Sequence, residues 1–127
     1  MKSGQIAGGI AGLVAGIAGI IFYIIGGMIG VLPQTPANVS RIVINIVDTI
    51  IFGIIFSMIY TKFHDNVPGK GAMKGLYFGL MIWLIKDIAA GTYVYNMGAP
   101  TISASLMFVG FFMWVTYGPV LATLYKK

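Results

Sequence analysis

Residues 77–91 read YFGLMIWLIKDIAAG, an apolar run that carries two charged residues, Lys86 and Asp87, near its middle. A transmembrane helix needs about 20 predominantly apolar residues, so this run can form much of one. A charged side chain at the centre of a bilayer costs about 2.5–3.5 kcal/mol on insertion scales. We therefore expect the rest of the chain to supply partners for these charges or to shield them by close packing.

The overall composition predicts an integral membrane protein. Hydrophobic residues make up 58% of the 127 residues and charged residues only 9%, whereas a soluble domain has about 25% charged residues. The absence of cysteine excludes disulfide chemistry and thiolate metal sites, and a single histidine excludes a bis-histidine haem within one chain. The net charge of +5 requires no nucleic acid, because loops of membrane proteins are often rich in lysine.

The hydropathy pattern predicts one domain, residues 1–127, with four transmembrane helices. The expected helices are residues 5–32, 39–60, 72–95 and 101–125. Proline and glycine turns separate them. The first apolar run is longer than the roughly 7–15 residues of a secretory signal and shows no convincing cleavage site, so we expect it to be retained as a helix.

The distribution of lysines predicts the orientation. Four spans place both termini on one side, together with the 61–71 loop and most of the basic residues, which are Lys2, Lys62, Lys70, Lys74, Lys126 and Lys127. Arg41 lies on the other side, so the positive-inside rule makes both termini cytoplasmic. The expected fold is all-α: an antiparallel four-helix bundle in the cell membrane, N-in and C-in. Tyrosines are expected to form belts at the two interfaces, with Tyr93 and Tyr95 outside and Tyr60, Tyr117 and Tyr125 inside.

Glycines at four-residue spacing predict close helix packing, either within the bundle or between chains. They are Gly8, Gly12, Gly16, Gly26 and Gly30 in the first helix, and Gly75 and Gly79 in the third. Glycine in a helix costs about 1 kcal/mol relative to alanine in water, so their number indicates a packing role. The pattern Gly-Leu-x-x-Gly at 12–16 recurs at 75–79, which fits either a duplicated two-helix unit or, the reading we favour, chance similarity between glycine-rich helices.

Three segments carry a resemblance to a known group. They are residues 51–60 (IFGIIFSMIY), 68–71 (PGKG) and 74–84 (KGLYFGLMIWL), an apolar hairpin with a short basic turn. This hairpin, about a quarter of the chain, resembles the YagU-type group of small prokaryotic membrane proteins. The resemblance implies four helices and a bacterial or archaeal membrane, and it implies no activity. The Lys86-Asp87 pair lies outside the shared pattern.

Five polar residues predict a network inside the membrane. Arg41, Asn45 and Asp48 follow an i, i+4, i+7 pattern and so form one stripe on the second helix. Asp48 and Asp87 each lie about 12–14 Å from the outer edge, close to the midplane of a core about 30 Å thick. Adjacent residues on a helix do not face each other. We therefore expect Lys86 to pair with Asp48 on a neighbouring helix, which leaves Asp87 to find Arg41, Asn45, another chain or a proton.

This network allows two interpretations. A buried ion-pair network can fix the register of the helices without transporting anything, and the balanced charges slightly favour this role. Alternatively, ionisable residues inside a membrane can form a proton or cation relay or bind a polar ligand.

The other polar residues predict no catalytic centre. His64 and Asp65 are expected to be solvated in a loop and do not suffice for a metal site. Trp83 is expected to pack in the core, and Ser103 and Ser105 to bond to backbone carbonyls. Because no nucleophile, base and orienting group come together in the sequence, we expect no enzyme, cofactor or metal.

The sequence therefore predicts a non-enzymatic component of the membrane, surrounded by lipid and assembled through its glycine faces as a homo-oligomer or within a larger complex. The alternative is a small oligomeric transporter or channel, coupled to protons or cations, that uses Asp48, Lys86 and Asp87. Small multidrug transporters of similar size depend on a glutamate in the first helix, and this chain contains no glutamate.

Overall fold

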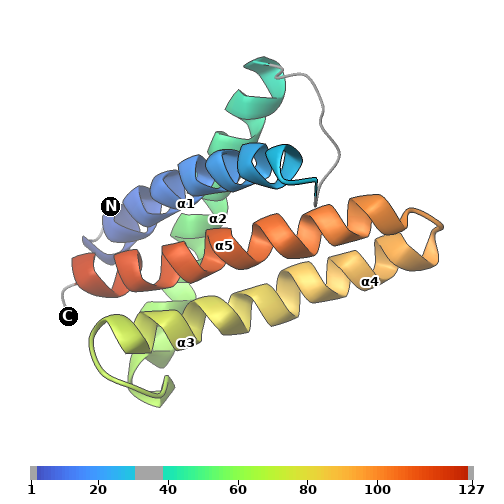
Figure 1. The fold of residues 1–127 in the computed structure, drawn as a ribbon. Coiled ribbons are helices and arrows are strands. Elements are labelled where there is room, and N and C mark those ends of the chain that lie inside the picture. Colours follow the sequence, from blue (N-terminus) through green and yellow to red (C-terminus); the bar gives the residue numbers. More distant parts are fainter. Residues whose placement is uncertain (1–2, 31–38, 126–127) are drawn as a thin grey trace.

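The structure is a computed structural model that describes residues 3–30 and 39–125. In these ranges the chain is helical and contains no strand (Figure 1). The elements are α1 (Ser3–Met28), α2 (Val39–Phe63), the 3₁₀ turn η1 (His64–Asn66), α3 (Ala72–Ile82), the π-helical turn η2 (Trp83–Ile88), α4 (Ala89–Asn96) and α5 (Pro100–Leu124). Because η2 joins α3 directly to α4, these three elements form one continuous helical stretch.

Four helical stretches are long and apolar enough to cross a membrane, which indicates a multi-pass membrane protein. They are Gly4–Met28, Ile42–Asn66, Ala72–Asn96 and Pro100–Leu124. The last three expected helices agree closely with these stretches. The predominantly apolar composition of these segments explains this agreement, since a segment in lipid must satisfy its backbone groups internally, as a helix does.

The first helix ends at Met28, earlier than expected from the apolar run. Gly30 has a φ of +82°, a conformation typical of the residue that terminates a helix. No atom of the described residues lies within 4 Å of the position that a Cβ of Gly30 would occupy. Gly30 therefore makes no close helix contact within the described part of the chain, whereas Gly26 is buried within α1.

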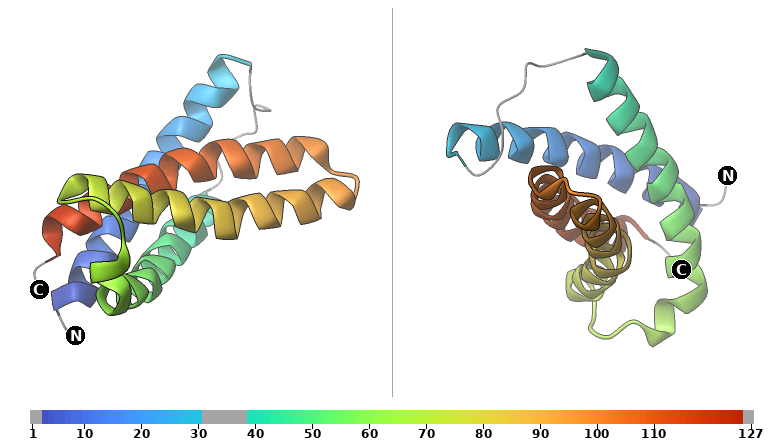
Figure 2. Two further views of the ribbon diagram at one scale, coloured as in Figure 1. Left: turned by 90° about the horizontal axis from the view of Figure 1, so that it is seen from below. Right: turned by 90° about the vertical axis from the view of Figure 1, so that its right-hand side faces the viewer.

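Helix α5 is the central element of the bundle. It packs against α1 on one side and against α3, η2 and α4 on the other, while α2 packs mainly against α1. Figures 1 and 2 show α5 lying alongside the continuous α3–α4 stretch, with α2 crossing at a steep angle. The second and third helices pack closely near the loop that joins them, and farther along they meet mainly where Lys86 reaches the ring of Phe52. Near the loop the rings of Tyr60 and Phe78 lie 5.0 Å apart.

Glycines bring α1 and α2 into backbone contact. A Cβ on Gly8 would overlap the carbonyl of Gly53, and a Cβ on Gly12 would overlap the carbonyl of Thr49. A Cβ on Gly16 would overlap the hydroxyl of the same threonine. The predicted close contact of this glycine face is thus present, and it lies within one chain rather than between chains.

Two hydroxyl groups in this interface are satisfied by their own helix. Ser57 donates to the carbonyl of Ile54 at 2.6 Å, and Thr49 donates to the carbonyl of Ile46 at 2.9 Å. Both side chains are buried. Since each hydroxyl finds its acceptor within α2, α1 can press against it without leaving a polar group unpaired.

A second glycine contact joins α3 to α5. A Cβ on Gly75 would overlap the carbonyl of Gly118, and a Cβ on Gly79 would overlap the carbonyl of Trp114. Each copy of the Gly-Leu-x-x-Gly pattern therefore packs against the next long helix of the chain, α2 in one case and α5 in the other. Common ancestry of the two halves and chance similarity both remain consistent with this arrangement.

Side-chain hydrogen bonds connect the helices further. Tyr117 of α5 is fully buried and donates its hydroxyl to the carbonyl of Gly53 at 2.5 Å. It is a core residue, so its predicted place in an interfacial belt was wrong. Tyr60 is buried as well. Tyr93 and Tyr95, by contrast, are 68% and 62% exposed, as an interfacial position requires.

Three smaller predictions are confirmed by hydrogen bonds to backbone carbonyls. Ser103 donates to Gly91 of α4 at 2.6 Å, and Ser105 donates to the carbonyl of Thr101, one turn earlier, at 3.0 Å. Trp83 is half-buried and packs against the core, with its indole N–H bonded to the carbonyl of Met107 at 3.0 Å.

The glycine contact predicts different effects for two neighbouring substitutions. Gly12→Ala should destabilise the protein by about 1–3 kcal/mol, because overpacking forces the helices apart. Gly9→Ala is the matched control, since its Cβ would meet Ile54 at an ordinary 3.5 Å. It should be neutral or slightly stabilising. Equal unfolding free energies of the two variants in detergent micelles would contradict the packing described here.

Candidate functional site

The two charged residues of the third span lie in the π-helical turn η2. A π-helix has more residues per turn than an α-helix, so consecutive side chains diverge by less than about 100°. Lys86 Nζ lies 3.4 Å from Asp87 Oδ1, and the two residues form an ion pair within the turn. Single π turns inside α-helices occur frequently at functional sites, which makes this turn a candidate.

The ammonium group of Lys86 also faces two aromatic rings. It lies 5.2 Å from the ring centroid of Phe52 on α2 and 5.6 Å from that of Trp114 on α5. A cation within about 6 Å of a ring centroid is attracted by the negative face of the ring. The positive charge is therefore shared between one carboxylate and two rings, while 36% of the side chain stays exposed.

Asp87 is packed against the backbone of α5. A Cβ on Gly110 would overlap its carboxylate, so a larger residue at position 110 would require the Asp87 side chain to move. Asp87 Oδ2 is buried and has no hydrogen-bond partner among the residues that the structure describes. Gly110 belongs to the site, although sequence reasoning did not identify it. The one available signal was a glycine in the middle of an apolar helix.

The expected pair between Asp48 and Lys86 is not formed. Asp48 is exposed on α2 and makes no ion pair with any described side chain. The next residue, Thr49, is the one that α2 turns toward α1. A rotation of about 100° per residue then directs Asp48 away from that contact. The long Lys86 side chain instead reaches Asp87, which the sequence argument had excluded on α-helical geometry.

The predicted network of five residues is therefore only partly assembled. Lys86 and Asp87 are in contact, whereas Asn45 and Asp48 lie exposed on α2. The side chain of Arg41 lies outside the described residues. Asn45 and Asp48 lie on one side of α2, as the spacing predicts, and this side faces outward from the bundle.

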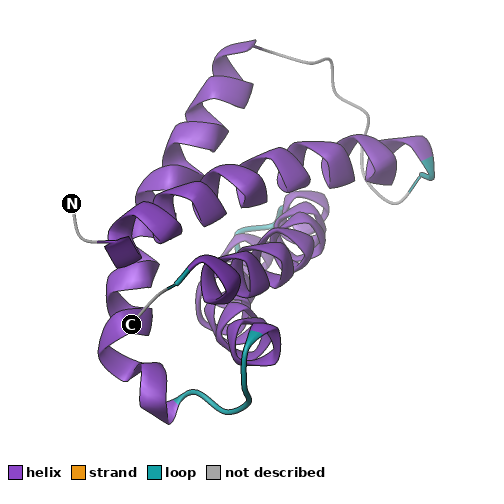
Figure 3. Cartoon of the chain, turned by 90° about the vertical axis from the view of Figure 1, so that its left-hand side faces the viewer, coloured by secondary structure: helices purple, strands orange, loops and turns teal. Residues whose placement is uncertain are grey.

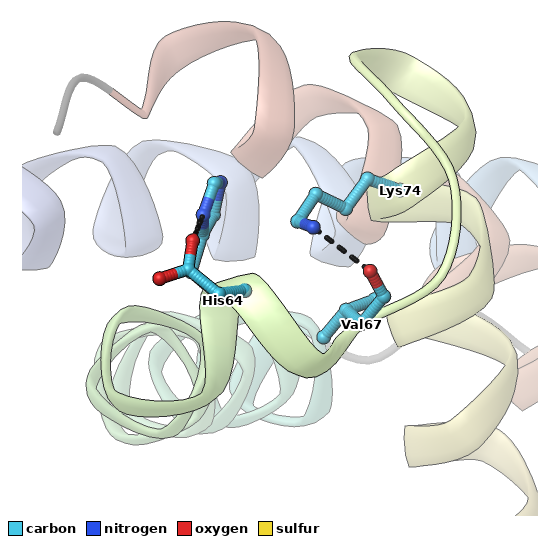
Figure 4. A network of polar contacts seen from close by, with 4 residues as sticks. His64, Val67 and Lys74 are labelled. Atoms are coloured by element: carbon cyan, nitrogen blue, oxygen red, sulfur yellow. Dashed lines mark hydrogen bonds and ion pairs between the residues drawn. The ribbon is translucent and has the colours of Figure 1, made fainter.

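A second polar cluster lies where α2 ends and α3 begins (Figure 4). The ring of His64 stacks on that of Tyr125, with centroids 5.1 Å apart, and its side chain is only 24% exposed. Its Nδ1 lies 3.3 Å from Asp65 Oδ1, and Lys74 donates to the carbonyl of Val67 at 2.8 Å. The expectation that His64 is solvated was wrong, because aromatic side chains from α2 and α5 enclose the ring.

The charged pair inside the spans can hold a polar group or exchange a proton, but it does not resemble a catalytic centre. It offers one cation and one carboxylate, with aromatic and glycine neighbours on the remaining sides. Across residues 3–30 and 39–125, no group of three or more histidine, cysteine, aspartate or glutamate residues could hold a metal ion.

Comparison with known proteins gives no match: no family model, no curated protein and no solved structure is similar to this chain. The resemblance to the YagU-type group stays a prediction. Function is therefore argued from the geometry of the chain alone.

The ion pair predicts a specific pattern of energetic coupling. Lys86→Met should destabilise the protein by leaving Asp87 without its cation, and adding Asp87→Asn should recover part of the loss. Residues in contact typically couple by about 0.5–3 kcal/mol. In micelles dilute enough to hold single chains, Asp48→Asn and Lys86→Met should instead be additive within about 0.5 kcal/mol. Strong energetic coupling between Asp48 and Lys86, together with no coupling between Lys86 and Asp87, would show that Lys86 pairs with Asp48 and not with Asp87.

Proposed function

We propose that this protein is a non-enzymatic component of a membrane assembly and that it meets its partner through the exposed face of α2. The observation that carries this proposal is Asp48. It lies three residues from Ile51, the centre of α2 (Val39–Phe63), which is about 4.5 Å along the helix axis. An exposed charge at that depth faces lipid unless another protein covers it, and lipid contact would cost about 2.5–3.5 kcal/mol.

The low burial of α2 also supports its exposed face as the surface that contacts a partner. Only 17% of the most apolar stretch of α2 is buried, against 28–33% in the other three spans. Asn45 is exposed one turn before Asp48, so a second polar group lies on the same side. Polar residues inside membranes almost always face protein or water rather than lipid. Apolar neighbours on this face, Ile44, Val47 and Ile51, would complete a helix-packing surface.

The partner that we propose is a second copy of the chain. Lys86 remains partly exposed and touches the ring of Phe52, which lies one turn beyond Asp48 on α2. One face therefore presents an acidic and a basic group at similar depth. Such a face is self-complementary across a two-fold axis, because each copy can offer its Lys86 to Asp48 of the other.

The packing of the glycines changes how assembly is proposed to occur. The sequence suggested assembly through glycine faces, but Gly12 and Gly75 already pack against helices of the same chain. The α2 face takes over this role in the proposal. Transport has less support, since Asp87 is 4% exposed and pressed against Gly110 rather than open to a described cavity.

We also propose an antiparallel bundle in the cell membrane with both termini cytoplasmic. The support is the grouping of Lys62, Lys70 and Lys74 at one end of the spans, because lysine is enriched in cytoplasmic loops. A bacterial or archaeal membrane is implied by the resemblance to the YagU-type group.

The assembly proposal is tested by energy transfer between donor- and acceptor-labelled copies in liposomes. Wild-type transfer should rise with the ratio of protein to lipid, and Asp48→Asn should weaken association severalfold to about tenfold. Thr92→Val removes an exposed polar group from α4 and should leave transfer unchanged. Absence of transfer in the wild type, or equal transfer in Asp48→Asn, would rule out this interface. If a different protein copurifies with the wild type and is lost from Asp48→Asn, the α2 face remains the interface and that protein, rather than a second copy of the chain, is the partner.

The orientation can be tested by single-cysteine labelling, because the chain has no cysteine of its own. Lys70→Cys and Asn96→Cys place one thiol in each of two exposed turns. In intact cells an impermeant maleimide should label position 96 and should reach position 70 only after permeabilisation. The opposite labelling pattern would invert the topology.

A further inference from the structure

A cavity of about 270 Å³ lies at the end of the bundle where α2 ends, α3 begins and α5 ends. It is lined by Tyr60, His64, Gly69, Lys70, Gly71, Lys74, Ala122 and Tyr125. These residues fall at the ends of three of the apolar spans, so the cavity lies at the level of lipid headgroups if the helices cross a bilayer. Its volume is just below the range of about 300–1,000 Å³ that is typical of small-molecule sites.

The lining of the cavity is cationic. Lys70 and Lys74 both contribute to it, and none of the lining residues is acidic. Lys74 is held in position by its hydrogen bond to the carbonyl of Val67, which uses one of its three ammonium protons (Figure 4). The carboxylate of Asp65, which contacts His64 Nδ1, is 78% exposed and does not line the cavity. An anion would therefore meet two positive charges and no lining carboxylate.

The start of α3 adds a partial positive charge next to the cavity. Gly69 and Gly71 have φ values of +94° and +57°, and they allow the loop to turn sharply into the helix. Helix α3 has no side-chain cap and no acidic residue in its first turn. The N-terminus of a helix carries a partial positive charge, and Gly71, which precedes α3, lines the cavity, so this end of α3 favours a negative ligand.

Tyr60 provides an independent indication of a ligand. It lines the cavity and the residue as a whole is 1% exposed, and its hydroxyl makes no hydrogen bond to another residue that the structure describes. Its ring is fixed by edge contacts with Tyr125 and His64, at centroid distances of 5.2 Å each. A bound acceptor in the cavity would give this hydroxyl a hydrogen-bond partner.

We propose that this cavity binds a phosphate group, through Lys70, Lys74 and the hydroxyl of Tyr60, beside the N-terminus of α3. The group can come from the headgroup of an anionic phospholipid or from free phosphate. The position of the cavity at the ends of the spans favours the lipid, since basic pockets between transmembrane helices bind anionic headgroups. This site is independent of the α2 face and of the Lys86–Asp87 pair.

The test compares ligands by thermal unfolding of the protein in dodecyl maltoside at constant ionic strength, because screening affects every charged ligand. Phosphatidylglycerol should raise the unfolding temperature and phosphatidylcholine should not. Stabilisation by inorganic phosphate as well would assign the site to a free anion. Failure of both phosphatidylglycerol and inorganic phosphate to stabilise the protein would overturn the proposal.

Three variants locate the binding site. Lys70→Gln should weaken binding about tenfold, because it removes a charged hydrogen-bond donor. Tyr60→Phe removes only the hydroxyl and should weaken binding about threefold to tenfold without loss of fold. Lys62→Gln is the matched control, an exposed lysine at the end of α2 that does not line the cavity. Equal loss in Lys62→Gln and Lys70→Gln, or unchanged binding in both Lys70→Gln and Tyr60→Phe, would refute the site.

Discussion

Backbone contact at Gly53 is the constraint on which the arrangement of three helices depends. On one side a Cβ at this position would overlap Gly8 and Gly12 of α1, and on the other its carbonyl accepts the hydroxyl of Tyr117 from α5. Helices in lipid gain little from the hydrophobic effect on association, so close van der Waals contact and interhelical hydrogen bonds must hold them. Gly53 provides both at one point, which explains how α2 can stay attached while much of its surface is exposed.

A second local feature with wide consequences is the π turn at Trp83–Ile88, which belongs to a chain that is helical outside its loops and turns in the described residues (Figure 3). It brings Lys86 and Asp87 together within one turn, so the third span carries its own counter-ion and needs no acidic partner on α2. Asp48 is thereby left without an internal role. The exposure of Asp48 on α2 and the Lys86–Asp87 pair in η2 thus have the same cause. The exposed Asp48 supports contact with another chain, whereas the Lys86–Asp87 pair lets the third span satisfy its charges within the bundle.

The two ends of the molecule differ in chemistry. The turn between α4 and α5 is flanked by exposed tyrosines and carries no charge, whereas the opposite end combines lysines, His64 and the uncapped start of α3 around one cavity. Tyr60 of α2 and Tyr125, which follows α5, line this cavity, and the ring of Tyr60 packs against both Tyr125 and Phe78 of α3. These ring contacts join three helices beside the two lysines of the cavity.

The sequence by itself determined the membrane class, the four spans and the glycine faces, because these depend on composition and on spacing along a single helix. It also identified Lys86 and Asp87 as the charges to be explained. Their pairing, the outward direction of Asp48 and the enclosure of His64 were decided by the tertiary structure. A rotation of one residue moves a side chain by about 100°, and a single π turn alters that angle. Which face meets which helix therefore depends on where backbones approach most closely, at Gly53 and Gly118, and spacing along one helix does not reveal the partner across the contact.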